Sequence, residues 1–327
     1  MPFLAAITAA ALLHGAVLTA NETGHSISVV DTARWTVRTV QLSLAPHNVQ
    51  VSADGRFAYA TALQPVADMP GMDMDSMMNG PGYLLQFDLR NIAAGPAFSV
   101  VVGKHPAHVV ADSANRYAYV TVSGEDAVKV VDLARHAVAA TIPTGKMPHG
   151  ARLSPDGAML YVADMDESTV SFIDVAQRRE IARVEAGKQP VQVAVSPDGK
   201  TVYATLGGEN AVAVIDAATR KRRALVNVGP NPAQLYIAPD GRRLYVANQG
   251  TREHPGHTVS VIDTARDAVT ATVDVAPGAH GVTVSPDGSH VYVTDAFASS
   301  LTEIDARTLQ IRSIKIGAGP NGVTFVP

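Results

Sequence analysis

The stretch SPDGKTVYAT at residues 196–205 joins a Pro-Asp-Gly turn to a run of alternating β-forming residues. A tight turn between two alternating runs is typical of a β-hairpin. The same pattern returns along the chain as SADGRFAYAT at 52–61, DSANRYAYVT at 112–121, SPDGAMLYVA at 154–163, APDGRRLYVAN at 238–248 and SPDGSHVYVTD at 285–295. The chain is therefore a series of repeats, and each repeat contains one strand pair at this turn.

The spacing of the turns indicates what each repeat builds. The turn position falls at 115, 157, 199 and 241, which are 42 residues apart. Two more β-forming runs follow each hairpin, as at 258–263 and 268–273. A unit of about 40 residues with four strands is typical of one blade of a β-propeller.

The two ends of the chain complete one blade between them. Residues 322–327 repeat the pattern of 281–286, and residues 16–42 supply the other three strands of that blade. The innermost strands are expected to begin near 49, 109, 151, 193, 235, 282 and 323. The sequence thus predicts an all-β, seven-bladed β-propeller with four-stranded blades over residues 16–327. Its ring is closed by pairing of the N- and C-terminal strands, which removes free sheet edges.

These repeats resemble the YVTN-type β-propeller family, whose YncE-like members share the SPDG turn, the YVAN strand and the VSVID strand. The resemblance covers residues 16–327 and implies the fold rather than one function, because such propellers include exported binding proteins, lactonase-like enzymes and reductase domains. The arrangement is also similar in outline to the propeller of nitrous oxide reductase, where histidines at one channel end carry a copper cluster. This chain has no cysteine, so the electron-entry copper domain of that enzyme has no counterpart.

Composition narrows the function classes. A net charge of −4 gives no basic field for nucleic acid, so no nucleic-acid partner is expected. Residues 1–15 are apolar and small, and they indicate a signal peptide or an N-terminal extension. If the segment is a signal peptide, the protein is periplasmic or otherwise exported. The segment is too short and too interrupted for a membrane span, so no stable membrane insertion is expected.

An insertion at 64–82 departs from the repeat. Five of the nine methionines of the chain lie in it, on a loop rich in Gly and Asp: Met69, Met72, Met74, Met77 and Met78. Clustered thioethers are soft ligands that favour Cu(I). The segment is predicted to be a copper-capture loop, with an apolar protein-interaction patch as the alternative.

Histidines gather where the innermost strands begin. His47, His149 and His280 occupy equivalent positions, and His108 lies one place later in its own repeat. Imidazoles from several blades could converge there on one ion, so these four are the predicted metal ligands. Carboxylates and further soft ligands are expected on the same face, and they form a secondary set: Asp164, Asp295, His105, Met147, His254 and His257.

Three functions remain open from the residues alone. The first is an exported propeller that binds or handles copper through the Met-rich loop and the histidines at the channel mouth. The second is an enzyme that uses the same funnel, either a copper redox enzyme or a lactonase-like hydrolase, although no catalytic signature allows catalytic residues to be assigned. The third is a scaffold that docks a periplasmic partner protein.

Overall fold

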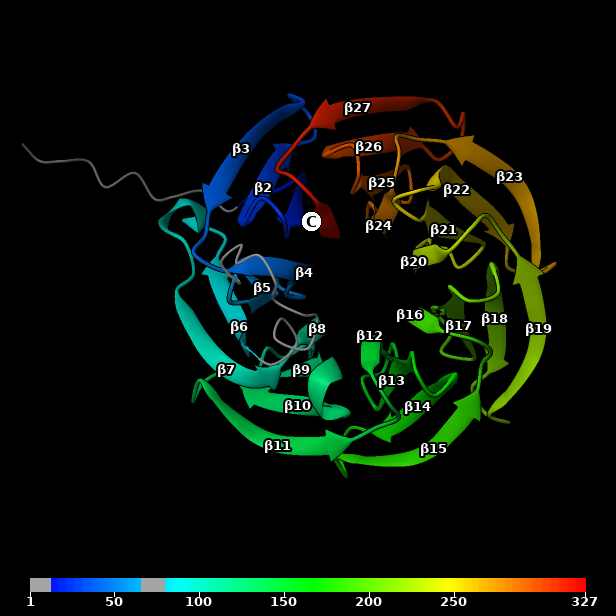
Figure 1. Cartoon of the computed structure of the whole chain (residues 1–327), viewed down its shortest axis with the longest axis horizontal. Coiled ribbons are helices and arrows are strands. Elements are labelled where there is room, and N and C mark those ends of the chain that lie inside the picture. Colours follow the sequence, from blue (N-terminus) through cyan, green and yellow to red (C-terminus); the bar gives the residue numbers. More distant parts are fainter. Residues whose placement is uncertain (1–12, 66–79) are drawn as a thin grey trace, which may run out of the picture.

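The computed structural model describes residues 13–65 and 80–327. Seven four-stranded antiparallel sheets are arranged around a common axis, which confirms the predicted all-β, seven-bladed propeller (Figure 1). The first blade combines the C-terminal strand β28 (Pro320–Val326) with β1 (Ala16–Asn21), β2 (Ser26–Asp31) and β3 (Thr36–Gln41). The second blade consists of β4 (Ala45–Val51), β5 (Phe57–Leu63), β6 (Pro81–Asp88) and β7 (Phe98–Lys104). The third blade consists of β8 (Pro106–Ala111), β9 (Tyr117–Val122), β10 (Ala127–Asp132) and β11 (Ala137–Pro143).

The other four blades follow the same order from the channel outward. The fourth blade consists of β12 (Pro148–Leu153), β13 (Met159–Asp164), β14 (Thr169–Asp174) and β15 (Arg179–Glu185), and the fifth of β16 (Pro190–Val195), β17 (Thr201–Leu206), β18 (Ala211–Asp216) and β19 (Lys221–Asn227). The sixth blade consists of β20 (Pro232–Ile237), β21 (Arg243–Gly250), β22 (Pro255–Asp263) and β23 (Ala268–Asp274). The seventh consists of β24 (Ala279–Val284), β25 (His290–Asp295), β26 (Ser300–Asp305) and β27 (Ile311–Lys315). Two short 3-10 turns, η1 (Ile92–Ala94) and η2 (Ser123–Glu125), lie in connections.

The core lies between neighbouring blades. Tyr161 and Phe172 of one blade pack with Val193, Val202 and Ile215 of the next, and all five side chains are buried. The middle strands are apolar on both faces because each face meets an adjacent blade. The outermost strands alternate, as in β19, because their outer side meets solvent.

The repeated turn is held by its own polar residues. In the turn at 196–199, the Ser196 hydroxyl donates to Asp198 Oδ1 at 2.6 Å, and the Lys200 backbone N–H donates to the same oxygen. Gly199 has a φ of +72°, a conformation that a residue without Cβ adopts at little cost. These turns form one face of the ring, called here the turn face.

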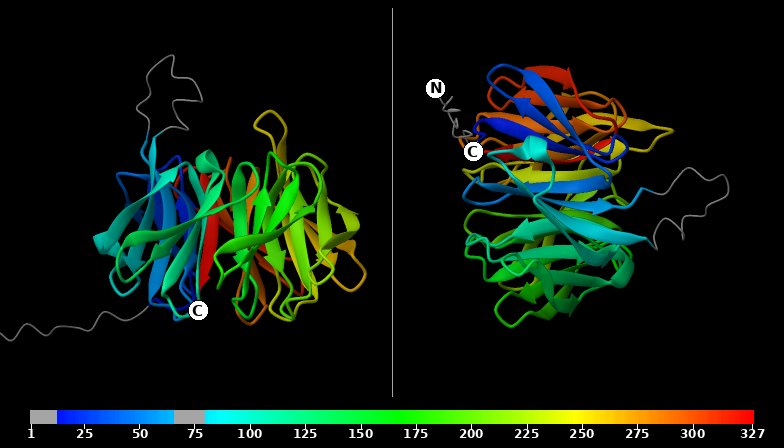
Figure 2. Two further views of the ribbon diagram at one scale, coloured as in Figure 1. Left: turned by 90° about the horizontal axis from the view of Figure 1, so that it is seen from below. Right: turned by 90° about the vertical axis from the view of Figure 1, so that its left-hand side faces the viewer.

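Pairing of β1 with β28 closes the ring, as predicted. The contacts begin before β1, since the Gly15 N–H donates to the carbonyl of Val326 at 3.0 Å. The side chain of Leu13 also packs against a buried cluster that includes Leu18 and Val326. The C-terminus lies at the turn face, and the β21–β22 hairpin projects from the opposite face, called here the mouth face (Figure 2). The described part of the chain contains no helix long and apolar enough to cross a membrane.

The innermost strands begin about three residues earlier than the sequence predicted. In β12, Pro148 pairs with Asp164 and Ala151 pairs with Val162, so His149 and Gly150 face a single partner residue. This is a β-bulge, and equivalent register shifts occur in the innermost strands of the other blades. A bulge interrupts the alternation of side chains, which is why a pattern based on alternation placed the strand start after it.

Threonines on the second strands join each bulge to the next blade. The hydroxyl of Thr205 accepts the N–H of Gln192 in its own blade at 3.0 Å and donates to the carbonyl of Ala233 in the next at 2.8 Å. Thr61, Thr121 and Thr294 make the same pair of hydrogen bonds. The bulges are therefore fixed relative to one another around the channel.

The Thr205 bridge predicts a loss of stability when its hydroxyl is removed. Thr205→Val has nearly the same volume but leaves a buried N–H and a buried carbonyl without partners, so we expect the free energy of unfolding to fall by about 1–3 kcal/mol. Urea denaturation measures this change. Thr205→Ser keeps both hydrogen bonds and is the control. Equal stability of the Val and Ser variants would contradict the bridge.

Candidate metal centre

All four histidines predicted to be ligands lie in the bulges of innermost strands. His47 is in β4, His108 in β8, His149 in β12 and His280 in β24. A bulge redirects side chains that regular pairing would send alternately into the neighbouring blades. His108 lies one position later in its repeat than the other three histidines, but it is still in the bulge, because Ala107 and His108 together face one partner residue.

The bulges bring three of these imidazoles into one cluster. One ring nitrogen each from His47, His108 and His149 lies within 4.8 Å of the others. The ring centroids are 6.1 Å apart for His47 and His108, 5.5 Å for His47 and His149, and 4.9 Å for His108 and His149. Three nitrogens at this spacing can bind one ion after small side-chain movements. His280 is outside this set of three but hydrogen-bonds within the same network.

Backbone carbonyls fix the tautomer of two histidines. The Nδ1 atom of His149 lies 3.0 Å from the carbonyl of Val191, and Nδ1 of His280 lies 3.2 Å from the carbonyl of Asn321. A carbonyl only accepts, so each Nδ1 carries the proton and each Nε2 keeps a free lone pair. This arrangement is typical of metal-binding histidines, whose other nitrogen is held by an acceptor.

A carboxylate does the same for His47. Nδ1 of His47 donates to Oε2 of Glu22 at 3.2 Å, and the side-chain amide of Asn321 donates to the same carboxylate oxygen. His47 Nε2 is buried and has no partner among the described residues. Glu22 and Asn321 thus connect His47 to His280 and leave a lone pair of His47 available.

His108 is held in the opposite tautomer. The side-chain Nε2 of Gln192 lies 3.3 Å from Nδ1 of His108, and Gln192 Oε1 accepts the N–H of Val193 at 2.9 Å. The second contact fixes the amide orientation, so Gln192 donates and Nδ1 of His108 accepts. In this state the proton is on Nε2 of His108, which is buried and has no partner within the described ranges. Ligation through Nε2 requires the Gln192 amide to turn.

Burial keeps most of the cluster neutral. It lowers the pKa of His149 to about 3 and that of His280 to about 4, and the charge of His47 acts in the same direction on both. Burial and then the neighbouring His149 and His47 hold the pKa of His108 well below its ordinary value. Neutral imidazole is the form that binds a metal ion.

His47 and Glu22 shift each other's pKa in opposite directions. Burial acts to lower the pKa of His47, but the charge and the hydrogen bond of Glu22 raise the pKa of His47 above its ordinary value. Burial acts to raise the pKa of Glu22, but His47 brings the pKa of Glu22 below its usual range. The site therefore combines one carboxylate with several neutral imidazoles, a donor set suited to a divalent or monovalent transition-metal ion.

Comparisons with known proteins agree with this architecture. Residues 183–326 match the family model of the YNCE-like beta-propeller. The resemblance to YncE-like propellers is confirmed. Residues 111–226 also match the family model of the cytochrome D1 heme domain. A search of curated proteins found no match.

Solved structures share the fold at low sequence identity. Hydrazine synthase of Kuenenia stuttgartiensis superposes with a TM-score of 0.70 at 21% identity, over 85% of this chain and 88% of that one. A functionally unknown protein from Desulfotomaculum acetoxidans gives 0.72 at 12% identity, over 94% of this chain and 98% of that one. The dihydro-heme d1 dehydrogenase NirN, in complex with DHE, gives 0.68 at 13% identity, over 95% of this chain and 75% of that one.

The secondary candidates are placed differently from one another. His105 adjoins the cluster, since burial and the charge of nearby His47 lower the pKa of His105. The N–H of Met147 is held by Asp126 Oδ1 at 2.9 Å. His254 and His257 are exposed in the β21–β22 hairpin, where His257 lies 3.9 Å from Asp274. Met69, Met72, Met74, Met77 and Met78 lie outside the described residues.

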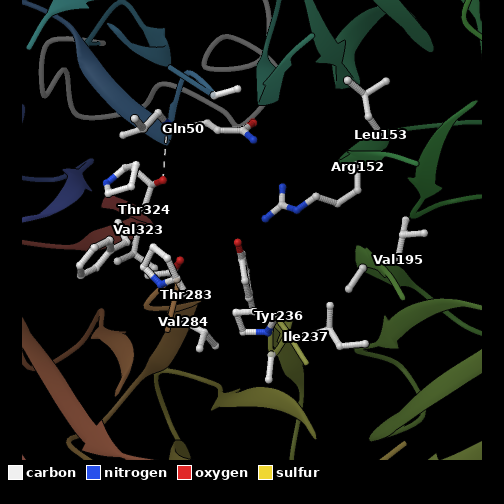
Figure 3. A pocket seen from close by; sticks show the side chains of 18 of the residues that line it. Gln50, Arg152, Leu153, Val195, Tyr236, Ile237, Thr283, Val284, Val323 and Thr324 are labelled. Carbon is white, nitrogen blue, oxygen red and sulfur yellow. Dashed lines mark hydrogen bonds between the residues drawn. The ribbon is translucent and has the colours of Figure 1, made fainter. Parts of the chain in front are cut away.

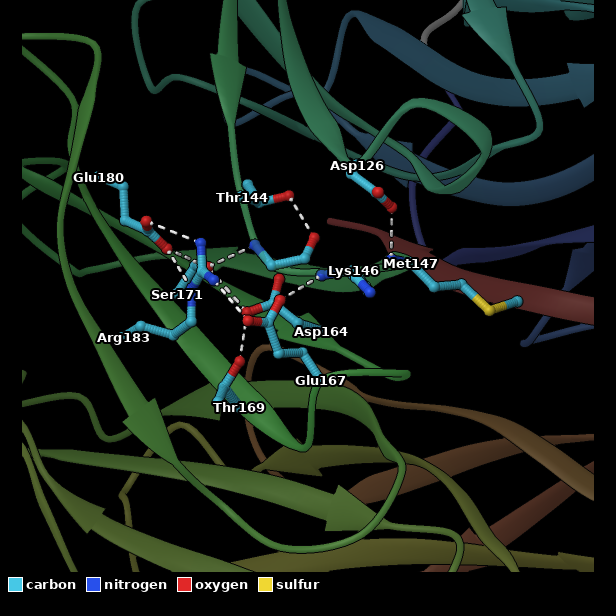
Figure 4. Close-up of polar contacts among 11 residues, drawn as sticks. Asp126, Thr144, Lys146, Met147, Asp164, Glu167, Thr169, Ser171, Glu180 and Arg183 are labelled. Carbon is cyan, nitrogen blue, oxygen red and sulfur yellow. Dashed lines mark hydrogen bonds and ion pairs between the residues drawn. The ribbon is translucent and has the colours of Figure 1, made fainter.

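Asp164 and Asp295 lie inside their own blades. Oδ2 of Asp164 accepts the hydroxyls of Thr169 and Ser171 at 2.9 and 2.8 Å (Figure 4). Oδ2 of Asp295 accepts Ser300 and Thr302 in the same way. Asn21 and Asn248 make equivalent contacts to third-strand hydroxyls in two other blades. The two aspartates therefore connect strands, and the structure does not bring them into the histidine cluster.

The sequence reasoning missed the partners that orient the ligands. The sequence pattern assigned no orienting role to Glu22, Gln192 or Asn321. Strand register is the sequence feature that could have identified Gln192. In its own blade Gln192 occupies the bulge position that His108 occupies in another blade. That equivalence is visible only once the bulge is known.

Burial makes the stability of the protein depend on pH through Asp164 and Asp295. It raises the pKa of each carboxyl from 3.8 to about 7, and Oδ1 of each has no partner among the described residues. Because the pKa of each carboxyl is higher in the folded state than in the unfolded state, the protonated carboxyl contributes stability. This contribution is complete below about pH 4 and is lost as the pH rises through about 7.

Replacing either aspartate by the asparagine found in two other blades should therefore stabilise the protein at high pH. We expect Asp164→Asn and Asp295→Asn each to raise the free energy of unfolding at pH 8 by roughly 1–3 kcal/mol, with the gain disappearing near pH 4. Chemical denaturation at both pH values measures it. Asp166→Asn, at an exposed turn, is the control. A gain that is equal at both pH values would contradict the assigned cause.

Proposed function

We propose that this propeller binds a transition-metal ion at the mouth of its channel, with copper as the first candidate, and that it works as an exported copper-handling protein. The observation that carries the proposal is the cluster of His47, His108 and His149, with ring nitrogens within 4.8 Å of one another. Imidazole ligands suit copper, zinc, iron and nickel, so the histidines alone do not select among these metals. The Met-rich segment at 64–82 supports copper, because thioethers favour Cu(I).

The donor set fits a metal ion that can exchange. His47 and His149 offer Nε2 lone pairs on imidazoles whose Nδ1 atoms are held by Glu22 and by the Val191 carbonyl. His108 supplies a third nitrogen once Gln192 turns. With no cysteine, the site lacks a thiolate, which suits reversible transfer better than permanent retention. Residues 1–15, whose composition indicates a signal peptide, support export.

The match to the cytochrome D1 heme domain favours a second candidate, a tetrapyrrole ligand. The imidazoles do not fit it as a group, because ring centroids 4.9–6.1 Å apart leave no space between them for a macrocycle. We derive no chemical step through such a group. Titration with hemin, followed by the Soret band, provides the comparison with metal titration.

Metal titration of the chelator-treated protein tests the first candidate. We expect stoichiometric binding of Cu(I) or Cu(II) in competition with a chromophoric probe. In His47→Gln and His149→Gln the affinity should fall by more than the roughly 10–100-fold that loss of an outer-shell partner causes, because a ligand itself is lost. His136→Gln, at an exposed turn on the outside of its blade, is the control.

Three outcomes of this titration would decide against parts of the proposal. Zinc binding tighter than copper would replace the copper assignment, and equal losses in His136→Gln and the cluster variants would exclude the cluster as the site. Changing all five methionines of the loop to Leu should weaken Cu(I) binding and leave Cu(II) binding unchanged. Unchanged Cu(I) affinity would exclude the capture loop.

The tautomer of His108 gives a sharper prediction. Gln192→Glu can still accept the N–H of Val193, and its second oxygen can accept a proton from Nδ1 of His108, which frees Nε2 for the metal. We expect metal affinity to rise by about 10–100-fold. Gln234→Glu adds the same charge at the equivalent bulge position of the next blade and is the control. An equal rise in metal affinity in both variants would show that the added negative charge attracts the metal ion in general, and would contradict control through the tautomer of His108.

A further inference from the structure

A second site lies deeper in the channel, toward the turn face. A cavity of about 490 Å³ is lined by the innermost strands β4, β12, β16, β20, β24 and β28 together with prolines of the SPDG turns. None of the four histidines lines it. The cavity is therefore separate from the candidate metal centre, although β12 carries both His149 and Arg152.

Arg152 is the only charged side chain among the described residues that line the cavity. Its Nη1 donates to the carbonyl of Ala151 at 3.1 Å, and its guanidinium lies 5.9 Å from the ring centroid of Tyr236. It forms no ion pair with a carboxylate within residues 13–65 and 80–327. A guanidinium turned into a cavity without an acidic partner keeps most of its five donors available for a ligand.

Neutral polar groups surround this charge. Gln50, Arg152 and Tyr236 come from three different blades and point toward the middle of the cavity (Figure 3). Oε1 of Gln50 is buried and has no partner among the described residues. Thr283 adds a buried hydroxyl to the same lining. One cation with several uncharged hydrogen-bonding groups matches a single negative charge better than a dianion.

Most of the remaining lining is apolar, with Asn48, Ser52 and Thr324 as the further polar residues. Val195, Ile237, Val284 and Val323 contribute aliphatic side chains, and prolines of four turns, with the C-terminal Pro327, edge the cavity on the turn face. A pocket of this kind, with a few convergent polar groups in an apolar wall, is typical of a small-molecule site. The ligand it fits has an apolar body and one anionic end.

We propose that this cavity binds a small organic monocarboxylate, with Arg152 pairing with the carboxylate and Gln50, Tyr236 and Thr283 completing its polar contacts. The planar guanidinium fork matches a carboxylate in a two-point contact. The apolar body lies against the aliphatic wall. The ligand reaches the cavity from the turn face, on the side opposite the histidines.

Calorimetric titration with benzoate, benzamide and inorganic phosphate tests the proposal on chelator-treated protein. Benzoate should bind at least about tenfold more tightly than its neutral isostere benzamide and more tightly than phosphate, because only benzoate combines one negative charge with an apolar body. Equal binding of benzoate and benzamide, tighter binding of phosphate, or no benzoate binding at roughly millimolar concentration would overturn it.

Variants locate the site and separate it from the metal centre. Arg152→Met should weaken benzoate binding by about tenfold to a hundredfold, and Arg152→Lys should weaken it less, because the charge remains but the fork is lost. Arg266→Gln, an exposed arginine, is the control. His47→Gln should bind benzoate normally, so failure of this proposal is distinguishable from failure of the metal site.

Folding of the Arg152 variant is checked independently by its melting temperature. Arg152→Met should melt at the same temperature as the unchanged protein or higher, because a guanidinium without an acidic partner is costly to bury. A folded Arg152→Met variant that keeps its benzoate affinity would overturn the proposal.

Discussion

The hydrogen-bonded bulge at the start of each innermost strand is the constraint on which the channel depends. Seven strands must converge on one axis, and at the mouth face the register shifts so that side chains turn out of regular alternation. Threonine hydroxyls then tie bulges to neighbouring blades, and Thr121 alone fixes the N–H of His108 and the carbonyl of His149. The histidine geometry is therefore a property of the ring rather than of any one blade.

Charge divides the channel into two layers. At the mouth, Glu22 is the carboxylate that favours a bound cation, and most of the imidazoles are neutral. Below it, Arg152 is the charged side chain of the cavity among the described residues, and it favours an anion. The two layers act on each other, since Arg152 contributes to holding the pKa of His108 low. An anion bound to Arg152 would weaken the electrostatic repulsion between Arg152 and a cation at the mouth.

The repeats show how one position can serve the fold while another serves a ligand. In four of the seven blades the second strand carries an Asn or Asp at or near its end, namely Asn21, Asp164, Asn248 and Asp295, and each of these side chains holds hydroxyls of the third strand. Carboxylate and amide are interchangeable there in shape but not in charge. The bulge positions, in contrast, hold His, Gln, Asn, Ala, Val or Gly, and this variation leaves an asymmetric site in a nearly symmetric ring.

The sequence by itself determined the seven blades, their closure through β1 and β28, and the gathering of His47, His108, His149 and His280 at one face, because turn chemistry and a repeat period are local properties of a chain. Only the tertiary structure decided which nitrogens converge, which tautomers Glu22, Val191 and Gln192 impose, and that Asp164 and Asp295 belong to the blades. It also brought Gln50, Arg152 and Tyr236 into one cavity. Those residues are far apart in sequence, and they meet only because closing the ring aligns the same register position of different blades.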